Sequence, residues 1–239
     1  GIGAEFLQPR GGNLQVGLSH RSASRVEDPG LHEIRKGISS IAGDVQLTRP
    51  DMNYMEEGSP INASPSYLSM IEDLPCTEEV VPAVYRAGIV KDGEDIYGVV
   101  VKGRPGRVSD SLALAVSVQE SFARRTGISV GDRMLTYFVG EKMQVRQFNV
   151  AEIYDSGVDP DGKFLIYADI DDMRRLNGWT ADQASLLEVM LKPDFKTEKG
   201  MKESASQIGF IMNAYEQEED DTLIATSAIS KYRSAERRV

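Results

Sequence analysis

SVQESFARRTGISVGD, residues 117–132, opens the stretch of sequence that decides the fold. Ser117 and Glu120 have the spacing of a capping box, in which the serine hydroxyl and the glutamate carboxylate each accept a hydrogen bond from the other residue's backbone amide. Gly127 supplies the left-handed backbone conformation that ends many helices. The pattern therefore predicts a helix over 118–126.

The same stretch, which extends to Trp179, continues with a predicted hairpin, a strand and a second helix. Asp169 is placed to cap this helix and Gly178 to end it, with acidic residues in its first turn and basic residues later, as the helix dipole favours. The extended runs that form the hairpin and the strand cover 134–139, 143–153 and 164–167. We expect these elements to form one small unit inserted into a larger module.

The residues outside this unit predict alternating strands and helices. Asp92-Gly93 indicates a hairpin, and Ser64-Pro65 is typical of a helix start. Extended runs lie at 44–48, 80–90, 96–101, 186–191 and 210–215, and helical patterns at 31–42, 65–74, 195–209 and 223–229. This order is typical of a split βαβ arrangement. We therefore predict an α+β fold, with an outer subdomain of residues 30–104 and 181–232 and an inserted mixed α/β subdomain of residues 105–180.

Composition limits the classes of protein to consider. The chain has 239 residues, of which 41% are hydrophobic, so it is long enough for a sizeable core. It carries 27 basic and 37 acidic residues, a formal net charge of −10, which argues against binding nucleic acid through a basic face. The sequence contains no run of 18 apolar residues, so it predicts no membrane span, and its first residues do not resemble a signal peptide.

Both ends of the chain differ in composition from the rest. Residues 1–29 are rich in Gly, Ser, Arg and Gln without periodicity, and EFLQP at 5–9 resembles translated cloning polylinker. We interpret 1–29 as a leader or linker introduced by cloning, and 233–239 as a tail of the same kind.

The sequence offers little support for catalysis. A serine or cysteine nucleophile needs a base, usually histidine. His20 and His32 lie in or beside the polar leader, and the single cysteine, Cys76, lies in a connecting segment. We predict that the chain is not an enzyme and has no intramolecular disulfide.

Two segments suggest ligands but fit turns and loops better. Asp159 and Asp161 precede Gly162 as in a calcium loop, but Gly157 and Ala168 stand where that loop has its first and last ligands. The basic segment KGRPGR at 102–107 could hold phosphate, but it lacks the fingerprint of a phosphate-binding loop, and we interpret it as a crossing loop. We predict no metal and no cofactor.

Three segments resemble the extracytoplasmic core of FtsX-like, MacB-type ABC transporter permeases. They are GDVQLT (43–48), SFARRTGISVGD (121–132), and FNVAEIY (148–154) followed by LIYAD (165–169). Each motif is short, so their order and spacing carry the resemblance, which extends over 31–232.

The resemblance implies a domain with a porter-like subdomain, matching 30–104 and 181–232, and a "Sabre" subdomain, matching 105–180. It implies a location at the periplasmic face of the bacterial inner membrane and a non-enzymatic, mechanical function, driven by a separate cytoplasmic ATPase. The implied partners are the domain's own transmembrane helices, a second permease protomer, and a lipoprotein or other hydrophobic substrate.

The chain resembles the lipoprotein-releasing (LolC/LolE-like) type most, with the macrolide-export type as the other candidate. Relatives that recruit a periplasmic chaperone carry a longer, proline-bearing hook where this chain has the turn Val139-Gly140-Glu141-Lys142. The short turn argues against such a hook, although these four residues and a periplasmic chaperone stay our candidates for partner binding. The alternative interpretation is a free-standing binding module or cation-binding protein.

Overall fold

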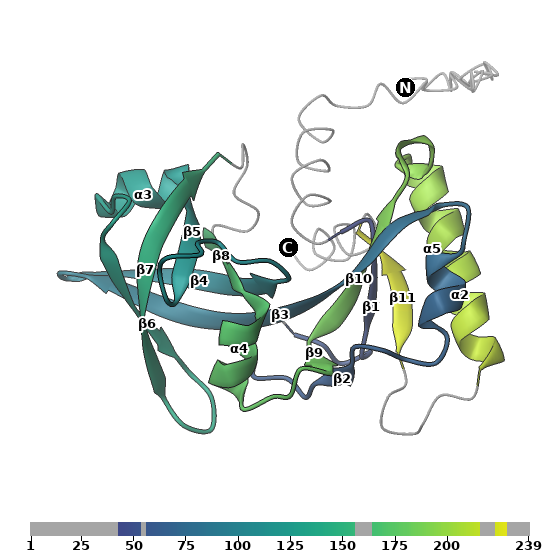
Figure 1. Cartoon of the computed structure of the whole chain (residues 1–239), viewed down its shortest axis with the longest axis horizontal. Helices are drawn as coiled ribbons and strands as arrows, with labels where there is room; N and C mark the ends of the chain where they lie inside the picture. Colours follow the sequence, from purple (N-terminus) through teal and green to yellow (C-terminus); the bar gives the residue numbers. More distant parts are fainter. Residues whose placement is uncertain (1–42, 54–55, 156–163, 216–222, 229–239) are drawn as a thin grey trace, which may run out of the picture.

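The computed structural model describes residues 43–53, 56–155, 164–215 and 223–228. It has the α+β class that the sequence predicts. Two lobes lie side by side, and we name them the sheet lobe and the barrel lobe (Figure 1). The long strand β3 (Thr77–Asp92) runs through both of them. None of the described helices is long and apolar enough to cross a bilayer.

The sheet lobe is a four-stranded antiparallel sheet with helices on one face. Its strand order is β11-β1-β10-β3, so β10 lies between β1 and β3. Buried residues of β1 and β10 pack with Ile71 of α2 and with Ile208 and Met212 of α5. The elements are β1 (Val45–Thr48), β2 (Ile61–Asn62), α2 (Leu68–Glu72), the first half of β3, β9 (Gln183–Ala184), β10 (Leu186–Leu191), η2 (Pro193–Phe195), α5 (Glu198–Ala214) and β11 (Ile224–Ser227).

The barrel lobe is a closed ring of six strands. The order is β3-β4-β8-β5-β7-β6, and β6 closes the ring by pairing with β3 at Ile89–Tyr137 and Val90–Thr136. Its elements are the second half of β3, β4 (Asp95–Arg104), β5 (Ala115–Gln119), α3 (Glu120–Thr126), β6 (Arg133–Phe138), β7 (Gln144–Tyr154), β8 (Phe164–Asp169) and α4 (Ile170–Asn177). Closure requires Gly88, because a Cβ there would lie 2.9 Å from Thr136 Cγ2.

β3 joins the two lobes without interruption. Residues 77–83 pair with β10 of the sheet lobe, and residues 84–92 pair with β4 of the barrel lobe. The strand has 16 residues, which at about 3.3 Å per residue spans roughly 50 Å. The division of the chain at 105 and 180 stays a prediction. Strand pairing and core contacts nevertheless group residues 84–104 with the barrel lobe.

Several local predictions are confirmed because neighbouring residues alone determine them. Asp169 caps α4 by accepting a hydrogen bond from the Asp171 amide at 2.7 Å. Gly127 and Gly178 end α3 and α4 with φ of +72° and +68°. The turn at Gly93, with φ of +60°, joins β3 to β4.

One predicted helix start and two predicted elements are wrong, and in each case long-range packing replaces the local preference. Residues 115–119 form β5, paired with β7 and β8, so α3 starts only at Glu120 and Ser117 caps nothing. Residues 210–214 continue α5 instead of forming a strand, because Met212 extends the buried face of that helix. Residues 224–227 form β11, paired with β1, instead of a helix.

Candidate functional site

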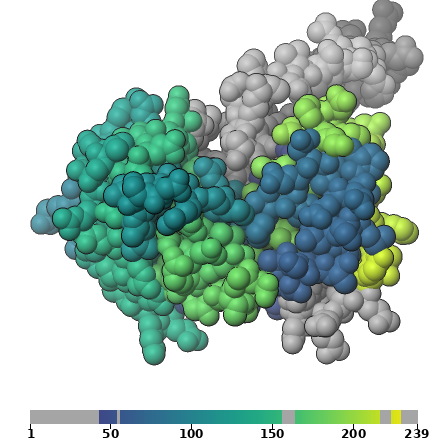
Figure 2. Space-filling view, viewed as in Figure 1, coloured from purple at the N-terminus to yellow at the C-terminus, as the bar shows by residue number. Residues whose placement is uncertain are grey.

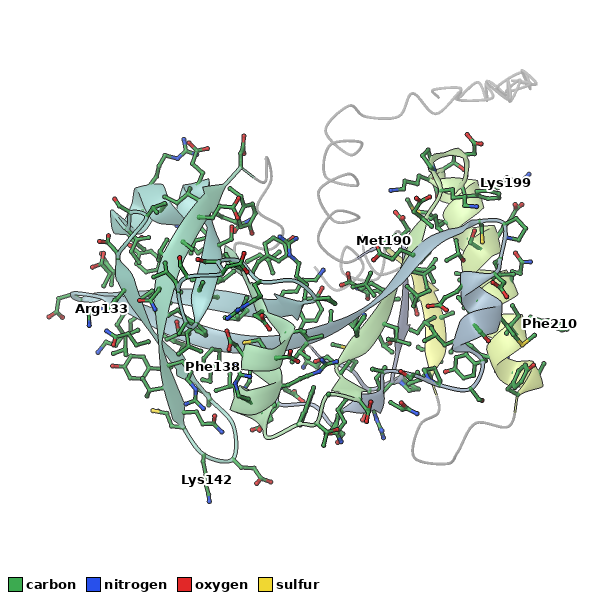
Figure 3. All side chains as sticks on the ribbon, in the orientation of Figure 1. Arg133, Phe138, Lys142, Met190, Lys199 and Phe210 are labelled. Atoms are coloured by element: carbon green, nitrogen blue, oxygen red, sulfur yellow. The ribbon has the colours of Figure 1, made fainter. Side chains whose placement is uncertain are left out.

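The predicted partner-binding residues Val139, Gly140, Glu141 and Lys142 form the turn between β6 and β7. The pair Phe138–Gln144 is the last of this ladder, and Lys142 lies at the free end of the hairpin (Figure 3). Two apolar side chains at the turn are largely exposed, Val139 at 58% and Met143 at 69%. Leu135 and Val145 on the adjoining strands are also exposed. The hairpin therefore presents an apolar surface, and whether a partner binds it stays a prediction.

The base of the hairpin is packed into the core of the barrel lobe. Phe138 is fully buried and meets Phe148 edge-on, with ring centroids 6.2 Å apart. The guanidinium of Arg86, on β3, lies 5.8 Å from the centre of the Phe138 ring. The hairpin is thus anchored to the strand that links the lobes.

Glu57 ties the turn to the sheet lobe. The carboxylate oxygen Oε2 of Glu57 accepts a hydrogen bond from the Glu141 amide at 3.2 Å and lies 3.4 Å from Arg86 Nη2. Any side chain at Gly140 would collide with this carboxylate. Sequence reasoning missed Glu57 and Arg86, because the two residues are far apart in the chain and neither belongs to a motif.

Arg86 is an unusual group to bury, at 2% exposure. Its Nη1 donates to Asn177 Oδ1 of α4 at 2.8 Å, while its Nε has no hydrogen-bond partner within the described ranges. Burial lowers the pKa of Arg86, and Arg146 adds to that effect, whereas Glu57 opposes it. Arg86 therefore connects β3, α4 and the hairpin through one charged side chain.

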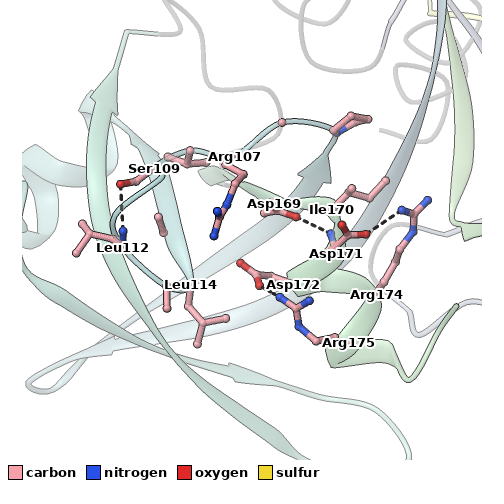
Figure 4. Close-up of a pocket in the computed structure, with 15 residues that line it drawn as sticks. Arg107, Ser109, Leu112, Leu114, Asp169, Ile170, Asp171, Asp172, Arg174 and Arg175 are labelled. Carbon is pink, nitrogen blue, oxygen red and sulfur yellow. Dashed lines mark hydrogen bonds and ion pairs between the residues drawn. The ribbon is translucent and has the colours of Figure 1, made fainter. Parts of the chain in front are cut away.

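A half-open cleft lies between residues 105–115 and the start of α4. Its volume is about 730 Å³, and the loop and α4 lie side by side in the space-filling view (Figure 2). Arg107 points into it, and Leu114 on its wall has a positive φ of 48° (Figure 4). The carboxylates of Asp171 and Asp172 pair with Arg174 and Arg175 of the same helix, so the chain itself neutralises much of the charge on this wall.

The predicted crossing loop at 102–107 is wrong for its first half. Lys102, Gly103 and Arg104 belong to β4 and pair with Tyr167, Ala168 and Asp169 of β8. Gly103 is required there, because a Cβ would lie 2.8 Å from Met173 Cγ of α4. Residues 102–104 are thus part of the barrel, and only residues 105–107 leave it as a loop.

Of the remaining candidates, Cys76 alone lies within the described residues. Cys76 is a buried free thiol. The described ranges hold no group of three or more His, Cys, Asp or Glu side chains arranged for a metal. Asp159, Asp161, His20 and His32 lie outside the described residues.

Comparison with known proteins gives structural similarity only. Neither a protein-family model nor a curated protein matches the sequence. The extracellular domain of the noncanonical ABC-type transporter YknZ from Gram-positive bacteria has a TM-score of 0.45 at 10% identity, covering 77% of this chain and all of that one. The periplasmic region of MacB from Actinobacillus actinomycetemcomitans has a TM-score of 0.44 at 12% identity, covering 84% of this chain and 95% of that one.

Proposed function

We propose that this chain is the extracytoplasmic domain of an ABC transporter permease subunit of the lipoprotein-releasing type. In this proposal a separate cytoplasmic ATPase drives the permease, and the domain moves at the periplasmic face of the bacterial inner membrane to release a lipoprotein or another hydrophobic substrate. The chain itself catalyses no reaction. The ordered motifs at 43–48, 121–132 and 148–169 support the family, as described above.

The observation that carries a mechanical function is the continuity of β3. A strand that is paired along its whole length with β10 and then with β4 moves as part of both lobes. Displacement of the sheet lobe must therefore displace the barrel lobe as well.

The positions of the start of β1 and the end of β11 fit this function. Val45, at the start of β1, pairs with Ser227, at the end of β11, and the Ala228 amide donates to the Asp44 carbonyl at 3.1 Å. Both strand ends therefore lie together at one place on the sheet lobe. In our proposal the membrane helices of the permease pull on the domain there, and the exposed apolar hairpin at the far lobe contacts the substrate or the second protomer.

Cysteine cross-linking in the full transporter tests the proposal. Met143→Cys, placed in both permease protomers, should give a cross-linking yield that changes when ATP is bound, because the barrel lobes would move relative to each other. Phe210→Cys is the matched control, since Phe210 is 76% exposed on α5 at the opposite end of the molecule (Figure 3). The native Cys76 is buried and should not react. Equal yields at Met143 with and without nucleotide would refute the mechanical function.

A further inference from the structure

Three buried polar side chains connect the two lobes on one face of β3. Lys102 Nζ, from β4, lies 2.7 Å from Glu188 Oε1 and 2.9 Å from Glu188 Oε2, and Glu188 belongs to β10. Tyr85, from β3, donates its hydroxyl to Glu188 Oε1 at 2.6 Å. We name Lys102, Glu188 and Tyr85 the joint.

The joint links β10 to β4, two strands that pair with different parts of β3. Glu188 is opposite Val81 in the β10–β3 ladder, and Lys102 is opposite Tyr85 in the β3–β4 ladder. The ion pair therefore spans the position where β3 leaves the sheet lobe and enters the barrel. It adds a side-chain link between the lobes to the covalent link that β3 provides.

Both charged side chains of this link are buried. Lys102 is 4% exposed and Glu188 is 3% exposed, so each charge depends on the other for compensation. The ammonium of Lys102 also lies 5.3 Å from the Tyr85 ring centre and 5.9 Å from that of Tyr167 on β8. Arg104 covers Tyr167 at 4.0 Å, which extends the contact further into the barrel lobe.

β1 begins next to Glu188, on the side of the joint away from the barrel lobe. Gly43 has a φ of +73°, and a Cβ there would lie 2.9 Å from Glu188 Cβ. The next residue, Asp44, donates its amide to the Val189 carbonyl at 3.2 Å and accepts from the Leu191 amide at 2.8 Å through Oδ2. The Asp44 carbonyl also accepts a hydrogen bond from the Ala228 amide, so the end of β11 lies beside the start of β1, which in turn pairs with the part of β10 that carries Glu188.

We propose that Lys102, Glu188 and Tyr85 form a conformational coupling device that holds the barrel lobe at a fixed angle to the sheet lobe and passes displacement at Gly43-Asp44 and Ala228 to the barrel. The direction of transmission rests on the proposed function. The fixed angle is a property of this chain and can be tested without a transporter. A cluster that only stabilised the fold would not control the angle between the lobes.

Distance measurement between two spin labels tests the joint in the full 239-residue chain. One label is placed at Arg124 on α3 and the other at Gln207 on α5, both of which are exposed. Lys102→Met combined with Glu188→Leu replaces the ion pair with apolar side chains of similar size, a change that often leaves stability intact, although here the Tyr85 hydroxyl also loses Glu188 as its acceptor, which lowers stability. We expect the width of the distance distribution to increase by about twofold or more as the lobes sample several angles.

A matched variant controls for the loss of an ion pair in general. Lys202→Met with Glu198→Gln removes an ion pair of 3.1 Å on the surface of α5 and should leave the width unchanged. A narrow, unchanged distribution in the folded Lys102→Met/Glu188→Leu variant would overturn the proposal.

A second pair of variants tests the joint if the double variant does not fold. Gly43→Ala pushes a methyl group against Glu188, whereas Gly93→Ala, in the turn between β3 and β4, imposes a similar backbone strain at φ of +60° with no atom within 4 Å. We expect only Gly43→Ala to shift or broaden the distance distribution, and equal effects of the two substitutions would overturn the proposal. ATP-independent cross-linking at Met143 together with a broadened distribution would refute the proposed function and leave the joint standing.

Discussion

Gly103→Ala should destabilise the protein although it changes a single hydrogen to a methyl group. Gly103 lies on β4, where α4 crosses the barrel, and the added Cβ would lie 2.8 Å from Met173 Cγ, 2.9 Å from Met173 Cβ and 3.0 Å from Ile170 Cα. The last contact is with backbone, so the clash cannot be relieved by rotating a side chain alone. α4 must move away from the sheet, or β4 must bend.

The magnitude follows from two opposing effects. Overpacking a well-packed core typically costs about 1–3 kcal/mol. Replacing glycine in a strand recovers about 0.5–1 kcal/mol, because alanine loses less backbone entropy on folding. We therefore expect a net loss of about 0–2.5 kcal/mol in the free energy of unfolding, centred near 1 kcal/mol, which at urea m-values of about 1–3 kcal/mol per M lowers the urea midpoint by roughly 0.3–1 M.

Gly98 provides the matched control, because it lies on the same strand and its added Cβ would meet no atom within 4 Å. Gly98→Ala should leave the urea midpoint unchanged or raise it slightly. Met173→Ala should cost less in the Gly103→Ala background than in the wild type, since it removes one of the clashing atoms. Equal midpoints for Gly98→Ala and Gly103→Ala would refute the packing of α4 on β4 described here.

Three further predictions concern charged groups. Glu57→Ala should accelerate hydrogen exchange of the Glu141 amide while lowering the free energy of unfolding by only about 0–1 kcal/mol, since the carboxylate is partly exposed; unchanged exchange would contradict the tie. Burial lowers the pKa of Lys102 in the folded protein below its usual 10.5. Between the folded pKa and 10.5 the unfolded chain therefore binds more protons than the folded chain. In that pH window Lys102 makes the free energy of unfolding rise with pH. Lys102→Met should remove this slope in denaturation curves recorded at alkaline pH, whereas the raised pKa of Tyr167 acts in the opposite sense only above 10.0. Asp169→Ala should cost about 1 kcal/mol in urea denaturation by removing the cap of α4, and a loss below a few tenths would show that the cap is dispensable.

The parts of the fold that could be predicted are those decided within a few residues. A cap needs a side chain and an amide two positions away, as at Asp169, and a helix end needs one residue that adopts positive φ, as at Gly178. Ser117 shows the limit of such reasoning. Its spacing to Glu120 fits a capping box, but β7 and β8 enclose the segment and hold it extended. Pairing with distant strands outweighs a local preference worth about 1 kcal/mol.

The candidate site was predictable only in its exposed turn. Val139–Lys142 could be located because a short polar turn between two extended runs is a local pattern. Glu57 contacts the turn across 84 residues of chain, and Lys102 meets Glu188 across 86. Neither contact leaves a periodic or spacing signal, so no argument from the sequence alone could have paired them. The same holds for the closure of the barrel, which depends on two residue pairs between β3 and β6.

Besides the contact of Glu57 with the hairpin turn, β3 and the joint link the lobes, and these two differ in what they can determine. β3 fixes the distance between the lobes, since a paired strand neither stretches nor shortens, but strands twist readily and a single strand determines an angle poorly. The hydrogen bonds of Glu188 to Lys102 and Tyr85 are directional, and a change of angle would leave buried polar atoms without partners. Apolar contacts of the same area would tolerate small rotations. A buried polar joint therefore fixes the angle between the lobes better than a larger apolar contact would. For this reason we expect the apolar double variant to stay folded while the angle between its lobes becomes variable.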